Sequence, residues 1–241
     1  MERGARGLGA ASAARAVRRL ALALLVAAGV PAMAQIPPTE PEVRAYTGLH
    51  AAAAAGNVVE IERLVAAGAN RELRDGNGRT PLHVAAYRRQ YNAARALLKG
   101  GANPNALDAQ RYDIVTIAAV ANDLPMLKIA LEGGTSPKNV TSPYDGTALI
   151  AAAHLGHVEV VQELIRAGAP LDHVNNLHWT ALMESVVLGD GGRRHTETLR
   201  ALVVAGANPN LADRKGVTPL QHAKHRGYAE MVKILEQAGA R

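Results

Sequence analysis

The tetrapeptide Thr80-Pro81-Leu82-His83 recurs in varied form along this chain of 241 residues, and its spacing decides the fold. Related tetrapeptides start at Thr47, Asp113, Thr147, Thr180 and Thr218, so that successive starts are 33, 33, 34, 33 and 38 residues apart. A second marker, Gly-Ala followed by Asn or Pro, keeps the same step at Gly68, Gly101, Gly168 and Gly206. Because two markers share one period, the sequence predicts an array of about six repeated units.

Each unit has the pattern of two short helices joined by turns. Thr80 is a good N-cap because its hydroxyl can accept from a free helix N–H, and Pro81 has no N–H to leave unpaired. The pair Ala85-Ala86 is small and lets neighbouring helices approach closely. A second helix, for example residues 158–166, carries apolar residues at helical spacing, and Gly168 can end it with a positive φ. One such pair cannot bury its own apolar face, so the units are expected to stack.

On these residues the sequence resembles the ankyrin-repeat family, whose repeat of about 33 residues carries a T-P-L-H-x-A signature. The resemblance covers residues 44–241 as six units that start near 47, 80, 113, 147, 180 and 218, the last one truncated. It implies an all-α ankyrin-repeat solenoid of helix–turn–helix units with β-hairpin-like connecting loops. It also implies that His50 and His83, at the fourth position of the signature, are structural and bind nearby backbone.

Composition and charge exclude several functional classes. Aromatic residues make up 3% of the chain, with no Phe and one Trp, which favours a core of closely packed aliphatic helices. The absence of Cys excludes disulfides, zinc–thiolate sites and a thiol nucleophile. The net charge of +6 comes largely from five Arg and one Glu in residues 1–34, and the remaining 22 basic and 20 acidic residues give +2. This near-neutral balance does not favour nucleic-acid binding.

Residues 1–34 have the pattern of a secretory signal peptide. An Arg-rich stretch precedes the apolar run 20–30, and Ala32-Met33-Ala34 offers a small-x-small cleavage site. The run is too short to span a bilayer, which needs ~20 apolar residues. We expect cleavage after Ala34, with a transit peptide or an uncleaved anchor as alternatives, and a flexible Pro-rich lead-in at residues 35–43. The mature chain is then exported, to the periplasm of a bacterium or, as an alternative, to the extracellular space.

Units three and five depart from the repeat pattern. Unit three lacks the initial Thr-Pro, carries Arg111 where Gly is usual, and has Pro125 near the start of its second helix. We therefore predict that unit three is the softest part of the array, with specialisation for a partner as the alternative. Unit five contains an insertion at Asp190–Arg194 (DGGRR), expected to be a flexible basic loop between its helices. A tolerated surface insertion is the favoured interpretation, and a functional loop is the alternative.

No catalytic motif of the common hydrolase, nucleotide-binding or zinc-protease types occurs in the sequence. The pairs His154/His157 and His222/His225 have i,i+3 spacing, but no carboxylate completes a metal site at a recurrent spacing. We therefore expect no enzymatic activity, no cofactor and no metal. A histidine-dependent metal-binding or enzymatic protein remains the third hypothesis.

The candidate partner-binding residues lie on the loops and at the ends of first helices, because Tyr, Trp and Arg are common interface anchors. They are Arg74, Arg79, Tyr87, Arg111, Tyr112, Tyr144 and Trp179. The alternatives are that the rings only cover adjacent loops and that the Arg side chains are solvated.

These patterns predict a non-catalytic interaction module that binds a partner protein through hairpin tips and a concave helix face. Resemblance to exported bacterial proteins suggests support of a periplasmic enzyme, and the alternative is a secreted effector acting on host proteins. We expect a monomer that binds neither nucleic acid nor, after signal cleavage, a membrane.

Overall fold

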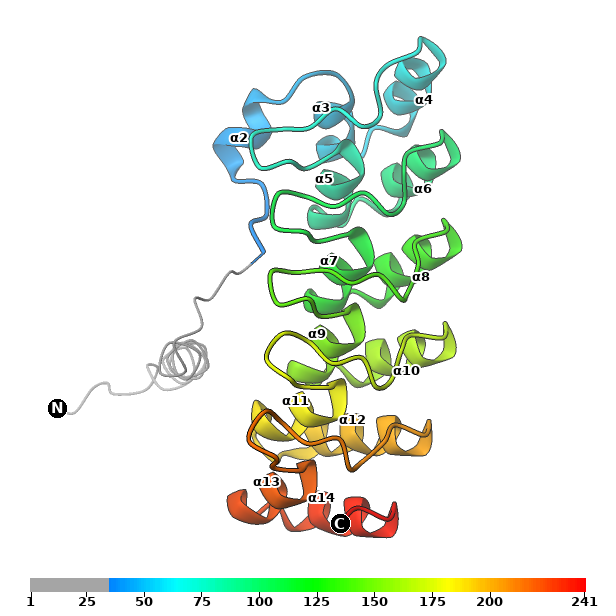
Figure 1. The fold of residues 1–241 in the computed structure, drawn as a ribbon. Coiled ribbons are helices and arrows are strands. Elements are labelled where there is room, and N and C mark those ends of the chain that lie inside the picture. Colours follow the sequence, from blue (N-terminus) through cyan, green and yellow to red (C-terminus); the bar gives the residue numbers. More distant parts are fainter. Residues whose placement is uncertain (1–34) are drawn as a thin grey trace, which may run out of the picture. The chain divides into compact units, whose positions relative to one another are not determined.

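The computed structural model describes residues 35–241, which form one compact unit. The predicted signal peptide at residues 1–34 lies outside the described residues. Within residues 35–241, six helix pairs stack in chain order, and Figure 1 shows each pair lying beside the next. The first helices are α3 (Gly48–Ala55), α5 (Pro81–Tyr87), α7 (Ile114–Val120), α9 (Ala148–His154), α11 (Ala181–Val187) and α13 (Pro219–Arg226). The second helices are α4 (Val58–Ala66), α6 (Tyr91–Lys99), α8 (Leu124–Glu132), α10 (Val158–Arg166), α12 (Arg193–Val204) and α14 (Ala229–Gln237).

The predicted all-α solenoid is confirmed, and its connecting loops resemble hairpins only in outline. The described residues contain no β-strand, and one isolated antiparallel bridge joins Thr141 to Gly146. The loops instead turn tightly, as where the Asp75 N–H donates to the Arg79 carbonyl at 3.0 Å. Each loop therefore projects a compact tip rather than a regular two-stranded ribbon.

Side-chain caps explain where the first helices begin. Thr80, Thr147, Thr180 and Thr218 each accept a hydrogen bond from the backbone N–H three residues later. In unit three Asp113 takes the place of Thr, and its carboxylate accepts from the Thr116 N–H at 2.8 Å. The degenerate tetrapeptide of unit three thus keeps a working cap, because Asp caps helices as well as Thr does.

The core is built from small and branched aliphatic residues between successive pairs. First helices pack on first helices and second helices on second helices along the whole stack. Ala85, Ala119 and Ala153 are completely buried on the first helices, and Leu149 is completely buried with them. Ala at these positions permits close helix approach, which agrees with the scarcity of aromatic residues.

Units three and five depart from the repeat pattern in sequence, but their backbone follows the geometry of the other units. Arg111 adopts φ 64°, close to the φ 70° of Gly78 at the equivalent place in the preceding unit, and Pro125 lies in the first turn of α8. The insertion of unit five is ordered rather than a flexible loop, because Arg193 and Arg194 extend the start of α12 to 12 residues. Asp190 Oδ1 holds the turn before them by accepting from the Gly192 N–H at 2.8 Å.

Residues 35–43, predicted to be a flexible lead-in, contact the repeat units in this structure. They continue into α2 (Glu40–Ala45), which begins with a capping box between Thr39 and Glu42. Residues 35–45, called the strap below, lie beside the loops of the first units in Figure 1. Gln35 Nε2 donates to the Thr116 carbonyl on α7 at 3.2 Å, so the strap reaches as far as unit three. These tertiary contacts fix a segment whose Pro-rich composition alone indicates mobility.

Candidate partner-binding surface

The loop tips share one local hydrogen-bonding device. Asp75, Asp108, Asn175 and Asp213 each use Oδ1 to accept from the backbone N–H groups two and four residues later, at 2.8–3.0 Å. The fourth residue directly precedes the helix N-cap, and it is Arg79, Tyr112, Trp179 and Val217 in turn. The tips 75–79, 108–112, 142–146, 175–179 and 213–217 and the first helices together form what we call the tip face.

His50 and His83 tie the tips at 75–79 and 108–112 to the helix of the unit before each. His50 Nε2 lies 2.9 Å from the Arg79 carbonyl, and His83 Nε2 lies 3.1 Å from the Tyr112 carbonyl. His83 Nδ1 accepts from the Thr80 N–H at 3.2 Å, so Nε2 carries the proton and donates. Burial lowers the pKa of His83 and keeps this neutral ring in place. The structural role implied for both histidines is confirmed.

Arg79 is buried, and this corrects its prediction as a partner-binding residue. Its side chain is 0% exposed and forms ion pairs at 2.6 Å with both Asp75 and Glu42. Its Nη1 donates to the Ile36 carbonyl at 3.0 Å, and Tyr46 Oη donates to Asp75 at 2.6 Å. All the groups that the guanidinium binds directly belong to the strap or to its own tip. Arg79 therefore binds the chain itself instead of facing outward.

Tyr112 and Tyr87 also belong to the interior of the tip face. Tyr112 is 6% exposed, and burial, together with the nearby charge of Asp108, raises its pKa to about 12. Tyr87 is half-buried and donates through Oη to Asp108 Oδ2 at 3.2 Å. Burial and the Asp108 carboxylate raise the pKa of Tyr87 as well. Both rings support the tip at 108–112, in line with the alternative that rings cover adjacent loops.

Arg74, Arg111 and Tyr144 are more accessible and join neighbouring tips. Arg74 Nη1 donates to the Gly78 carbonyl at 2.7 Å and also to the Leu107 carbonyl of the next tip. Arg111 pairs with Asp145 at 2.8 Å, with both side chains 49% exposed. Tyr144 is half-buried, and its carbonyl accepts from the Asn176 N–H at 2.9 Å. These three residues lie at the rim of the tip face.

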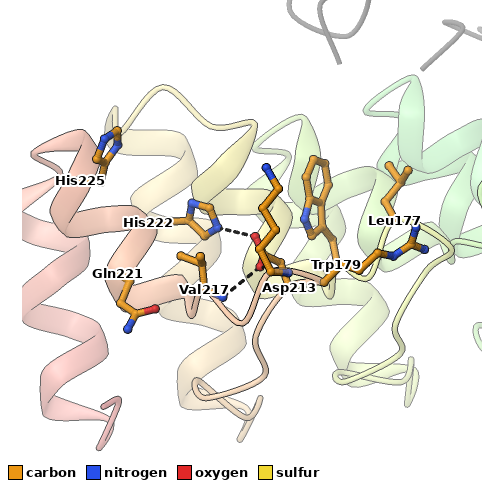
Figure 2. A pocket seen from close by; sticks show the side chains of 9 residues that line it. Leu177, Trp179, Asp213, Val217, Gln221, His222 and His225 are labelled. Atoms are coloured by element: carbon orange, nitrogen blue, oxygen red, sulfur yellow. Dashed lines mark hydrogen bonds and ion pairs between the residues drawn. The ribbon is translucent and has the colours of Figure 1, made fainter. Parts of the chain in front are cut away.

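Trp179 lines a groove between the tips of units five and six. The groove has a volume of about 690 Å³ and is lined by Leu177, Trp179, Asp213, Arg214, Lys215, Val217, Gln221, His222 and His225. Figure 2 shows Leu177 and Trp179 toward one end, His222 and His225 toward the other, and Asp213 between them. The Trp179 indole N–H donates to no group of residues 35–241, and the ring is half-buried. An accessible aromatic ring with a free donor is suited to an incoming ligand.

The groove combines apolar surface with positive charge. Asp213 Oδ2 accepts from His222 Nε2 at 2.9 Å. Burial alone would raise the pKa of Asp213, but hydrogen bonds from the Val217 and Lys215 N–H groups and from His222 hold it below its usual value. Arg214 donates to the Asn176 carbonyl at 2.7 Å, and Lys215 forms no ion pair within residues 35–241. The one carboxylate of the groove is therefore committed to the tip, while its cations face outward.

Sequence reasoning identified Trp179 but not the other wall of the groove. The stretch Asp213-Arg214-Lys215 has the same spacing as Asp75-Gly76-Asn77. In both, an aspartate lies two residues before the residue whose backbone N–H donates to it. That spacing is the signal that could have identified unit six as a full tip. No described group of three or more His, Asp or Glu residues is placed to hold a metal ion. Among residues 35–241, no helix has the length and apolar character needed to cross a membrane.

Comparisons with known proteins relate this arrangement to a repeat family. The family model described as ankyrin repeats (3 copies) matches residues 11–108 and 115–193. The putative ankyrin repeat protein YahD of Escherichia coli K12 is 36% identical over 103 residues, which are 42% of this chain and 51% of YahD. The chain thus matches about half the length of this curated relative.

Two solved structures resemble the stack closely. A crystal structure of an ankyrin repeat domain from Acinetobacter baumannii AYE matches with a TM-score of 0.77 and 44% identity, over 80% of this chain and 98% of that domain. The ankyrin repeat domain of Bcl-3, a member of the IkappaB protein family, matches with a TM-score of 0.73 and 28% identity, over 81% and 87% of the two chains.

Proposed function

Because this chain belongs to the ankyrin-repeat family, whose repeats are protein–protein interaction modules, we propose that it acts by binding a partner protein at the groove between units five and six. The observation that carries this proposal is Trp179, a half-buried aromatic ring with an unused donor at the wall of that groove. Tryptophan is among the residues that most often dominate binding energy at protein interfaces. The ankyrin fold is generally non-catalytic, and we propose that this chain acts by binding alone.

The distribution of contacts favours the C-terminal half of the tip face as the open part. The strap already binds the tip of unit two through Arg79 and reaches Thr116 of unit three. The groove at units five and six lies beyond these contacts along the chain. A partner that binds there does not compete with the strap.

Affinity capture tests this function. The purified protein is used as bait against the exported fraction of its source organism, beside a Trp179→Ala variant. As a matched control, Arg95→Ala removes an exposed side chain from α6, outside the tip face. We expect a single protein to be captured by the natural chain and by the control, and lost with Trp179→Ala. Equal capture by all three would contradict the proposal, provided that circular dichroism shows the variants folded.

We also propose that the protein acts after export, in the periplasm of a bacterium, on the support of the basic, apolar and small-x-small pattern of residues 1–34. Intact-mass analysis of the exported fraction tests it, with a chain that begins at Gln35 as the expected result. A chain found only in the cytoplasm would contradict it. Support of a periplasmic enzyme, the finer expectation, depends on the identity of the captured protein.

A further inference from the structure

The contacts of the strap indicate which kind of side chain the tip face can bind. Glu42 Oε1 accepts from Asn77 Nδ2 at 2.9 Å and from Arg79 Nη2 at 2.6 Å. Glu40, two residues earlier, pairs with Arg88 at the end of α5. The strap is thus an acidic segment of the form Glu-x-Glu. Asn77 and the cation Arg79 hold it at a tip, and the cation Arg88 holds it at the end of a first helix.

In unit six the positions of Asn77 and Arg88 are both occupied by cations, whereas Val217 takes the place of Arg79. Asn77 lies two residues after Asp75, and Lys215 lies two residues after Asp213. Arg88 lies eight residues after the N-cap Thr80, and Arg226 lies eight residues after the N-cap Thr218. The corresponding residues of the units that start at 47, 113, 147 and 180 are Ala55, Ala121, Leu155 and Leu188 at the second position. Only units two and six therefore carry the cation at the helix end.

In unit six these cations have no carboxylate to bind. Lys215 and Arg226 are exposed, and neither forms an ion pair within residues 35–241. Arg226 lies 6.0 Å from the ring centre of Tyr228, which holds its guanidinium near the end of α13. The nearby acids are already used, since Asp213 binds His222 and Glu236 binds Lys224 at 2.8 Å. The strap of this chain supplies the matching acids to unit two alone.

We propose that the groove of units five and six and its margin bind a Glu-x-Glu segment of the partner protein, with one carboxylate at Lys215 in the groove and the second at Arg226, the residue next to His225 of the groove lining. This inference rests on the proposed function and specifies the chemistry of its ligand. An apolar side chain of the same segment packs against Trp179 and Leu177. Residues 35–241 are otherwise close to neutral, so an acidic peptide suits these two cations better than a nucleic acid, which needs an extended basic surface.

The test uses the strap sequence itself as the probe. A fluorescein-labelled, amidated peptide of residues 36–43 (IPPTEPEV) is titrated into the purified full chain, with both Glu replaced by Gln in the control peptide. Anisotropy reports the affinity, and the emission of Trp179, the single Trp of the chain, reports binding at the groove. We expect saturable binding of the acidic peptide with a change in Trp179 emission, and at least about tenfold weaker binding of the Gln peptide.

Substitutions locate the bound peptide. The pair Lys215→Gln and Arg226→Gln should weaken binding by about tenfold, and added salt should weaken binding to the natural chain. Lys233→Gln, which removes an exposed cation from α14 outside the groove, should leave the affinity unchanged. Equal affinity for both peptides, an unchanged affinity in the double variant, or tighter binding of a single-stranded oligonucleotide that displaces the peptide would overturn the inference.

The two proposals fail in different ways. If the natural chain captures a protein through Trp179 but does not distinguish the Glu and Gln peptides, the binding function stands and the acidic chemistry is wrong. If the peptide binds as expected but no protein is captured, the groove has the inferred chemistry and the wrong compartment or partner source was sampled. Failure of both removes the groove as a binding site.

Discussion

Arg79 and Trp179 occupy the same position in their units, yet one is buried and the other lines an open groove. Both follow a tip residue, Asp75 or Asn175, that fixes the local backbone in the same way. The difference comes from Glu42, which reaches Arg79 from the strap and has no equivalent at unit five. The surroundings of a side chain, and not its place in the repeat, decide whether it is buried or stays accessible.

Removing the Arg79 charge should destabilise the protein. Arg79→Met leaves two carboxylates unpaired and should cost about 3 kcal/mol, at the lower end for a buried pair because Glu42 remains 33% exposed. The double variant Arg79→Met with Asp75→Asn should recover part of this loss, since Asn175 closes the tip of unit five without a charge. Denaturant unfolding measures both free energies. A double variant no more stable than the single would show that the unpaired Asp75 is not the cause.

The same cluster should make stability depend on acid pH. Burial alone would raise the pKa of Asp75, but hydrogen bonds from Tyr46 and from the backbone and side chain of Arg79 keep it below its usual value. The unfolded chain therefore takes up the proton first. The stabilisation is complete above the unfolded pKa of about 3.9 and is lost as the pH falls through the lower folded pKa. Thermal melts at acid pH should decline less steeply in Arg79→Met with Asp75→Asn than in the natural chain.

Substitutions at core and surface positions should differ sharply in how much they lower the free energy of unfolding. Leu149→Ala should cost ~2–5 kcal/mol, because the completely buried side chain leaves a cavity between helices. Arg193→Ala, at an exposed position in the first turn of α12, should cost less than ~0.5 kcal/mol. Denaturant unfolding of the two variants provides the comparison. Similar losses would show that the register of the units is wrong.

At the scale of elements, the strap is the part that sequence reasoning missed. The helix starts are local, since a Thr or Asp cap and a following apolar turn are visible in each unit. The position of the strap depends on its contact with Arg79, which lies more than 30 residues away. No local sequence pattern predicts that contact. Its own helix was detectable, because Thr39 and Glu42 have the spacing of a capping box. Likewise, the open groove depends on which tips the strap leaves uncovered.

The strap should protect the tip of unit two. Glu42→Gln removes the charge that binds Arg79 and Asn77, so the amides of residues 75–79 should exchange about tenfold faster. Glu40→Gln should have a smaller effect, because Glu40 is 65% exposed. Hydrogen exchange read by mass spectrometry separates the two, with the tip of unit five as an internal reference. Unchanged exchange in Glu42→Gln would show that the strap does not hold this tip.

At the scale of the whole molecule, the helix pairs of residues 48–237 form a chain in which each pair packs on its neighbours. Each unit stabilises the next, as in other repeat arrays, so local weakness is tolerated without loss of the fold. Unit three carries Thr116 where units one and two carry a histidine. Thr116 Oγ1 forms a hydrogen bond with Thr141 Oγ1 at 2.9 Å. This single hydroxyl contact stands where the ring of His83 forms two hydrogen bonds.

Unit three departs most from the repeat pattern, at Arg111 and Pro125, and should open before unit four. We expect the amides of α7 and α8 to exchange faster than those of α9 and α10 in the native protein. Equal protection of the four helices against amide hydrogen exchange would contradict the prediction that unit three is the least stable.

The tips also determine how such a protein can change during evolution. The hydrogen bonds that Asp75 and Asp213 accept within their tips remain within five residues of chain and use backbone N–H groups, so they do not depend on which side chain precedes the N-cap. In the five tips the residue before the N-cap is Arg79, Tyr112, Gly146, Trp179 or Val217, while the residue before it has a positive φ in every case. A lineage can thus exchange one partner for another by single substitutions, without first redesigning its scaffold.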